Sequence, residues 1–297
     1  MCTVKPITTV HPDPRPGGQA ADLTFAGTPR EVDADIMIPV YNEQAELASS
    51  VMLLSERLRR VKGAWDEFSW QVVIADNASS DATWRLATRL AEAYPDEVRA
   101  VRLTEKGRGR ALKRAWSTSR ARVRAYMDVD LSTDIEQVPD LILPVLDGEA
   151  DVCFGSRLLP ESQVTRCLKR ELISRTYNRM LRAYLGVKFR DAQCGFKAVS
   201  AGAAKTLLPA IVDNEWFFDT ELLYLAEACG MRTKEVAVRW VEDAGSTVRI
   251  ADTVKKDLAG MYRLRHGSRR RAAAGEAAPK AGSAGTALRR HGSAGAL

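Results

Sequence analysis

Short apolar runs alternate with longer segments of helical periodicity along the first half of the chain. The runs fall at 35–40, 71–75, 98–103 and 123–127, and the periodic segments between them fall at 43–61, 81–94 and 110–120. The runs predict buried strands and the longer segments predict amphipathic helices. Their alternation predicts right-handed βαβ units, an α/β fold and a mostly parallel sheet. Because ligands of such sheets bind beyond the carboxyl ends of the strands, those ends are the first candidates for function.

Three of the predicted strands end in acidic residues. The first ends in Pro39-Val40-Tyr41-Asn42-Glu43, the second is followed by 76–81, and the fourth is followed by Asp128-Val129-Asp130. A carboxylate at this position often caps the next helix, because it accepts hydrogen bonds from free backbone N–H groups. We expect such a cap at Asp81, which directly precedes a periodic segment. Asp76 is interpreted as a ligand-binding residue, with a helix cap as the alternative.

The pair Asp128 and Asp130 is the more specific signal. Side chains at positions i and i+2 of an extended segment point to the same side, so the two carboxylates lie together. Such a pair repels itself unless a cation is near. Its oxygens suit Mg²⁺ or Mn²⁺ bridging to a diphosphate. The alternative is a polar turn before 132–134, but the position after an apolar strand of a βαβ series favours the metal site.

A basic, glycine-containing segment precedes the third predicted helix. It reads Lys106-Gly107-Arg108-Gly109-Arg110. Glycines let the backbone approach a ligand closely, and basic side chains at a helix N-terminus favour phosphate. The segment matches neither the P-loop nor the dinucleotide fingerprint. A solvated basic turn is the alternative to phosphate binding.

The two ends of the chain differ in composition from its middle. Residues 1–30 hold five of the twelve prolines, and 267–297 are rich in Ala, Gly and Arg. We expect a disordered arm over 1–30, one folded domain over 31–266 and a disordered basic tail over 267–297. The tail has six basic residues and one acidic residue, so it carries five of the six net positive charges. The folded part is close to neutral, which argues against a nucleic-acid partner.

The cysteines and the apolar runs indicate where the protein works. Its five cysteines are odd in number and show no C-x-x-C spacing, which favours a reducing compartment over disulfides or zinc. No run of 18 apolar residues predicts a transmembrane helix, and the N-terminus has no apolar signal segment. We therefore expect a cytoplasmic protein, peripheral on the cytosolic face of a membrane if it meets one.

Taken in order, the motifs resemble family 2 glycosyltransferases. The first half supplies 38–43, 76–81, the basic glycine segment, 128–130 and Gly155-Ser156-Arg157. The second half supplies 169–174, 190–197 and 216–223. The resemblance covers about 35–249 and is nearest to the polyprenyl-phosphate mannose and glucose synthases. The form Asp-x-Gln-Cys-Gly-Phe-Lys, which ends at Lys197, resembles the dolichyl-phosphate glucosyltransferase branch.

The resemblance implies a GT-A fold with a donor site, a metal site and an acceptor site. The implied donor-binding residues are Pro39, Tyr41, Glu43, Asp76, Lys106, Arg108 and Asp128. The implied acceptor-phosphate residues are Arg157, Arg170, Ser174, Gln193 and Lys197. Mg²⁺ or Mn²⁺ would bind Asp128 and Asp130. The family often has Gln two residues after the second aspartate, whereas this chain has Ser132, so its metal surroundings can differ.

The implied reaction moves glucose or mannose from a UDP- or GDP-sugar to a polyprenyl or dolichyl phosphate in one inverting displacement. Asp130, Arg157 and Asp219 are the implied catalytic residues. A phosphate acceptor needs alignment and charge balance rather than a base. A sugar hydroxyl would need a base, and Asp219 lies where hydroxyl-directed members keep theirs. Asp219 as a cap of a helix over 220–228, and a catalytically silent carbohydrate-binding scaffold, are further alternatives.

The segment 165–185 interleaves basic and apolar residues at helical spacing. This pattern predicts a basic amphipathic helix in a membrane interface, and Arg269, Arg270 and Arg271 would add attraction to anionic lipid. The alternative is a helix that packs its apolar stripe on the core. Many relatives carry C-terminal transmembrane helices that this chain lacks, so a separate membrane anchor or flippase is a candidate partner.

Overall fold

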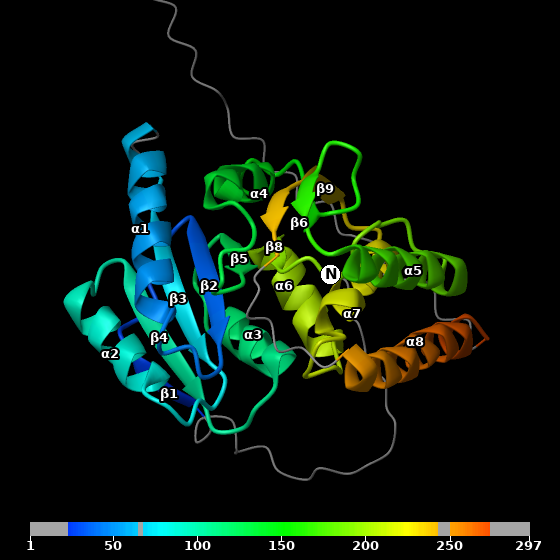
Figure 1. Ribbon diagram of the computed structural model, residues 1–297, viewed down its shortest axis with the longest axis horizontal. Helices are drawn as coiled ribbons and strands as arrows, with labels where there is room; N and C mark the ends of the chain where they lie inside the picture. Colours follow the sequence, from blue (N-terminus) through cyan, green and yellow to red (C-terminus); the bar gives the residue numbers. More distant parts are fainter. Residues whose placement is uncertain (1–22, 65–67, 243–249, 274–297) are drawn as a thin grey trace, which may run out of the picture.

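The computed structural model describes residues 23–64, 68–242 and 250–273, which form a sheet covered by helices on both faces (Figure 1). The strand order in its eight-stranded sheet is β1-β4-β3-β2-β5-β8-β6-β9. Their bounds are β1 Leu23–Ala26, β2 Ala34–Val40, β3 Trp70–Asp76, β4 Val98–Leu103, β5 Val123–Met127, β6 Val152–Ser156, β8 Phe196–Ser200 and β9 Thr233–Ala237. In this sheet β1 and β8 run antiparallel to their neighbours and the other pairings are parallel. The predicted α/β fold with a mostly parallel sheet is confirmed.

Eight helices lie in the described part of the chain. They are α1 Leu47–Ala64, α2 Thr83–Ala93, α3 Arg108–Ser117, α4 Val138–Leu146, α5 Leu168–Leu185, α6 Ala201–Leu207, α7 Phe218–Ala228 and α8 Ile250–Ala273, with short 3-10 turns η1 Ile135–Gln137 and η2 Leu208–Ala210. Two apolar clusters divide them: α1, α2 and α4 pack on one face of the sheet, and α3, α5, α6, α7 and α8 on the other. Within β2, Ile36 and Ile38 belong to the first cluster and Met37 to the second, as expected for a strand buried on both faces.

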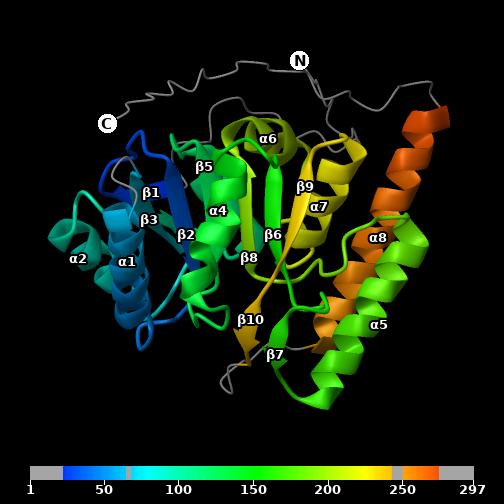
Figure 2. The same ribbon diagram turned by 90° about the horizontal axis from the view of Figure 1, so that it is seen from above.

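A second, two-stranded sheet lies beside the main one. It pairs β7 (Gln163–Thr165) with β10 (Arg239–Val241) in parallel. Figure 2 shows this ribbon at the end of the molecule where α5 and α8 lie side by side. This small sheet brings 163–165 and 239–241, which are far apart in sequence, to the edge of the fold near α5 and α8.

Two predicted boundaries of the domain are wrong. β1 lies inside the expected disordered arm 1–30, where it pairs antiparallel with β4. α8 runs to Ala273, seven residues into the expected disordered tail that begins at 267. Both ends gain order from partners far away in sequence, since β1 completes a sheet edge and α8 packs on α5. The remaining parts of both predicted segments, 1–22 and 274–297, lie outside the described residues.

No helix in the described ranges combines the length and the apolar character needed to cross a bilayer.

Candidate active site

The predicted donor residues gather at the carboxyl ends of β2 and β3. These strands are parallel and in register, with Val40 opposite Asp76. Asp76 is buried and accepts a hydrogen bond from the Ser79 N–H at 3.2 Å, and Arg102 Nε lies 3.2 Å from its carboxylate. Burial raises its pKa despite these contacts. Asp76 therefore belongs to the turn after β3 and does not cap α2, whose N-cap residue is Ala82.

Exposed and half-buried groups border this site. The Tyr41 ring stacks under Lys106, whose Nζ lies 3.4 Å from the ring centroid. Pro39 is half-buried at the end of β2, and Glu43 is half-buried in the turn before α1. Asp81 accepts a hydrogen bond from the N–H of Thr83, the first residue of α2, at 2.9 Å. It thus satisfies a free N–H of this helix as expected, although the N-cap position itself is Ala82.

The middle of the basic glycine segment is buried, whereas Lys106 at its start is exposed. Arg108 begins α3 and is buried, with Nη1 2.7 Å from Asp219 and Nη2 2.7 Å from Asp128. Its guanidinium also lies over the Trp216 ring at 4.9 Å. Gly109 permits this approach, since a Cβ there would lie 2.6 Å from the Cβ of Phe218. Arg108 links a candidate metal ligand to the candidate base.

Asp219 lies at the centre of a buried charge cluster. It accepts hydrogen bonds from Arg108 and from the Tyr126 hydroxyl, and Lys197 Nζ lies 3.1 Å away. Burial alone would raise its pKa, but Lys197 and Arg108 outweigh burial and hold the pKa below the usual value. The alternative of a helix cap at Asp219 is ruled out: α7 begins at Phe218, and Asp219 lies in the first turn with its side chain directed to these cations.

The two candidate metal ligands lie just beyond β5. Asp128 is 43% exposed at its side chain, and Asp130 is exposed and accepts the Ser132 N–H at 2.9 Å. Asp128 also lies against Gly195, where a Cβ would be 1.8 Å from Asp128 Oδ2. Within the described ranges no group of three or more His, Cys, Asp or Glu side chains is placed to hold a metal ion. Two carboxylates are therefore what the protein offers at this point.

On the acceptor side, Arg157 and Asp191 form an ion pair with two hydrogen bonds between their side chains. Nε and Nη2 of Arg157 lie 2.7 and 2.9 Å from the two Asp191 oxygens, and the Arg157 backbone N–H donates to the same carboxylate at 3.0 Å. Burial acts to raise the pKa of Asp191, but Arg157 outweighs it and lowers the pKa to about 2. The Cζ atom of Arg157 lies over the Trp240 ring, 5.4 Å from the ring centroid.

The remaining predicted acceptor residues occupy different surroundings. Arg170 pairs with Glu242 at 2.9 Å. Ser174 is buried, and its Oγ has no hydrogen-bond partner among the described residues. Gln193 donates to Asp257 at 3.3 Å, and burial raises the pKa of that carboxyl to about 6. Lys197 is wholly buried against Asp219, so the structure groups it with the charge cluster and apart from the other four.

Several residues of this site escaped sequence reasoning. Asp191 opens the Asp-x-Gln-Cys-Gly-Phe-Lys motif, so the motif itself was a signal for it. Trp240, Glu242 and Asp257 carry no local signal, because their partners lie more than 60 residues away.

The sequence is similar to known proteins over most of its length. The model of the family described as Glycosyl transferase family 2 matches residues 35–208. Glycosyltransferase AglD of Haloferax volcanii is 38% identical over 237 residues, which cover 80% of this chain and 37% of AglD. The human dolichyl-phosphate beta-glucosyltransferase is 30% identical over 221 residues, covering 71% of this chain and 68% of that protein.

The fold also has solved counterparts. Glucosyl-3-phosphoglycerate synthase from Mycobacterium tuberculosis, crystallised with Mn²⁺ and UDP-glucose, superposes with a TM-score of 0.55 at 17% identity, over 80% of this chain and 79% of that one. Its complex with UDP gives a TM-score of 0.56. These likenesses bear out the expected GT-A-type architecture. With a family match over most of the described sheet and these relatives, the chain belongs to glycosyl transferase family 2.

Proposed function

We propose that this protein transfers a hexose from a nucleoside diphosphate sugar to a polyprenyl or dolichyl phosphate, with inversion, at a membrane surface. The single observation that carries the choice of acceptor is the state of Asp219. Two cations and a tyrosine hydroxyl hold its carboxylate, so it is a poor base for a sugar hydroxyl. A phosphate brings its own nucleophilic oxygen, because its second pKa is about 6.

On the donor side, Asp76 and Tyr41 would bind the nucleoside, together with Pro39 and Glu43. Lys106 lies beside them and would contact the diphosphate. The residues present fit a divalent cation in their donor chemistry. Asp128 and Asp130 offer hard oxygen ligands, and Mg²⁺ or Mn²⁺ commonly completes its shell with water and substrate phosphates rather than with further side chains. When bound there, the cation would stabilise the negative charge of the leaving diphosphate.

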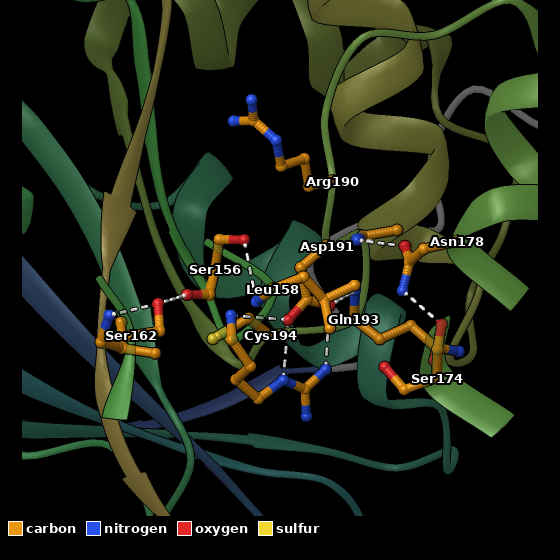
Figure 3. Close-up of polar contacts among 12 residues, drawn as sticks. Ser156, Leu158, Ser162, Ser174, Asn178, Arg190, Asp191, Gln193 and Cys194 are labelled. Atoms are coloured by element: carbon orange, nitrogen blue, oxygen red, sulfur yellow. Dashed lines mark hydrogen bonds and ion pairs between the residues drawn. The ribbon is translucent and has the colours of Figure 1, made fainter. Parts of the chain in front are cut away.

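On the acceptor side, Arg157 and Arg170 would receive the lipid phosphate. Guanidinium groups bind phosphate through paired N–H donors, which fixes direction as well as affinity. Ser174 and Gln193 lie on the neighbouring helix and loop and add hydroxyl and amide donors (Figure 3). Holding both reactants in line supplies much of the rate in a displacement of this kind.

The direct test is turnover by the purified protein. It requires Mg²⁺ or Mn²⁺, a short polyprenyl phosphate and a panel of radiolabelled UDP- and GDP-sugars. Transfer of one hexose to the lipid phosphate is the expected result, and the panel identifies the sugar and the base. Transfer to a free sugar and not to the lipid phosphate would contradict the proposal.

Removing either acceptor arginine is expected to weaken use of the lipid. Arg157→Ala and Arg170→Ala each lose a charge-assisted phosphate contact worth about 1.5–3 kcal/mol, so kcat/KM for the lipid phosphate falls roughly tenfold or more. Binding of the nucleotide sugar, measured by calorimetry, stays nearly unchanged. Arg232→Ala is the control, because Arg232 pairs with Asp151 through the same three contacts at the surface. An equal loss of nucleotide affinity would move the two arginines to the donor site.

We also propose that α5 docks on the membrane. Its buried stripe of Ser174, Tyr177, Asn178 and Leu181 packs inward, as the core-helix alternative predicted. Its outer face leaves Leu168 and Leu172 87% and 68% exposed among basic side chains. Such a surface suits the headgroup region of a bilayer. The cytosolic face is proposed because the four described cysteines are free, as a reducing compartment favours.

Docking predicts salt-dependent binding to anionic vesicles. The protein is expected to sediment with anionic liposomes at low salt, to be released by high salt and to bind less after truncation at Gly267, since each basic side chain near the surface contributes about 1 kcal/mol. Leu168→Ser with Leu172→Ser is expected to reduce sedimentation. Leu53→Ser on α1, a half-exposed leucine, serves as the control. Equal sedimentation with neutral and anionic liposomes, or none with either, would contradict electrostatic docking and favour a separate anchor protein.

A further inference from the structure

Arg157 is a buried cation whose orientation is almost wholly fixed. Asp191 holds its Nε–Nη2 edge through two hydrogen bonds and holds its backbone N–H through a third. The opposite group, Nη1, has no hydrogen-bond partner among the described residues. The Arg157 side chain is 12% exposed. The guanidinium therefore presents its Nη1 edge outward, while Asp191 occupies its Nε–Nη2 edge.

The same guanidinium lies over the Trp240 ring, and Trp240 is bridged to the segment 132–134, which follows the candidate metal ligand Asp130. On one side β10 pairs with β7, and on the other Trp240 forms an antiparallel bridge with Thr133. The Val241 N–H donates to Ser132 O at 2.9 Å, and the Asp134 N–H donates to Arg239 O at 3.0 Å. The backbone of 132–134, which follows Asp130, is therefore hydrogen-bonded to the backbone of 239–241, which carries the Trp240 ring under Arg157.

The loop 191–195 makes a second connection between the same two places. Asp191 at its start binds Arg157, and Gly195 at its end touches the Asp128 carboxylate. The antiparallel pairing of Met127 with Phe196 brings Gly195 next to Asp128. The Ala192 N–H donates to Asn178 of α5 at 2.9 Å, which anchors the middle of the loop (Figure 3).

We propose that Asp191 is a positioning residue, which turns the free edge of Arg157 toward the acceptor phosphate and fixes it relative to Asp128. Trp240 supports the same guanidinium from below, since the Cζ of Arg157 lies over its ring. The inference rests on the proposed function, since it needs an anionic acceptor at Arg157. Its physical basis is alignment: an in-line displacement depends on where the attacking oxygen is held relative to the leaving diphosphate.

Asp191→Asn keeps the side-chain shape and removes the charge that orients Arg157. With a short polyprenyl phosphate as acceptor, kcat/KM for the acceptor is expected to fall roughly tenfold or more, the loss typical of a charge-assisted contact. Nucleotide-sugar affinity and slow hydrolysis of the nucleotide sugar without lipid are expected to stay within about twofold, because they do not use Arg157. Asp191→Glu is expected to recover part of the loss.

Two comparisons separate positioning from general damage. Asp151→Asn breaks the matched surface pair with Arg232 and is expected to leave acceptor kcat/KM unchanged. In an Arg157→Ala background, Asp191→Asn is expected to add little further loss in acceptor kcat/KM, since residues that act as one unit are not additive. Equal losses in donor affinity, hydrolysis and acceptor use, or full additivity with Arg157→Ala, would overturn the proposal.

Trp240→Leu is the second variant if Asp191→Asn does not fold. It leaves the ion pair intact and removes only the ring under the guanidinium, so a smaller fall in acceptor kcat/KM with unchanged donor binding is expected. Unchanged acceptor kcat/KM in a folded Trp240→Leu protein would contradict the proposed geometry. Failure of the proposed function is distinct from either outcome, because the wild-type protein would then transfer no sugar to the lipid phosphate.

Discussion

Asp130→Ala is expected to abolish sugar transfer, and Asp128→Ala to reduce it strongly, while both proteins stay folded. Both carboxylates lie beyond β5, where they would hold the cation that balances the leaving diphosphate. Asp130 is exposed and the Asp128 side chain is 43% exposed, so neither belongs to the apolar core. Turnover with and without EDTA, together with calorimetry of Mn²⁺ binding in the presence of the nucleotide, measures the effect.

Asp147→Ala is the control for this test, because Asp147 is exposed at the end of α4, and the adjacent Leu146 meets Arg122 at the amino end of β5, opposite the end that Asp128 follows. Its transfer rate and Mn²⁺ affinity should match those of the wild-type protein. Wild-type activity of Asp130→Ala, or full turnover in EDTA, would reject the metal role. The two aspartates differ in one respect: Asp128 also neutralises Arg108, so its removal disturbs the buried cluster as well as the metal site.

Much of the sheet could be predicted because its strands are buried on both faces. The runs 98–103 and 123–127 coincide with β4 and β5, whose residues alternate between the two apolar clusters. The edge strand β1 has only four residues, two of them exposed. No local pattern separates such a segment from a loop, since its order comes from pairing with β4.

The donor side of the site was predictable from the parallel order of the strands. Asp76, Asp128 and the turn after β2 follow parallel strands, so the topology alone places them at one edge of the sheet. The acceptor side depends on long-range contacts. Arg157 meets Asp191 after 34 residues and Trp240 after 83, and only the fold brings them together.

Lys197 was predicted among the acceptor-phosphate residues, but its side chain lies in the buried charge cluster around Asp219. It belongs to the motif that contains Gln193, yet the alternation of β8 turns it into the core. There it meets Asp219 on α7, for which a helix cap was only an alternative to a catalytic role. The charges of Arg108 and Lys197 could be read from the sequence, but their common partner could not, because it lies 111 residues from Arg108.

Replacement of Asp219 is expected to act first on stability. Asp219→Ala would leave Arg108 and Lys197 as buried cations without their shared partner, which typically costs about 3–5 kcal/mol. The lowered pKa of Asp219 gives the sign of the pH dependence. The wild-type protein has this stabilisation above the ordinary carboxyl pKa of about 3.9 and loses it as the pH falls through the lower, folded value. Urea unfolding of both proteins at several pH values measures the difference.

The buried pair of Asp35 and Arg99, both at most 1% exposed, provides the matched control. Asp35→Ala should destabilise the protein to a similar extent, yet leave transfer intact at a temperature where it is folded. Asp219→Asn distinguishes the two acceptor classes. If Asp219 were a base, Asp219→Asn would abolish transfer even at a temperature where the variant is folded, while its nucleotide-sugar affinity stayed unchanged. With a phosphate acceptor, Asp219→Asn should instead lose activity only as far as it loses stability and displaces Arg108. Nucleotide-sugar affinity should then fall together with activity, because Arg108 connects Asp219 to Asp128.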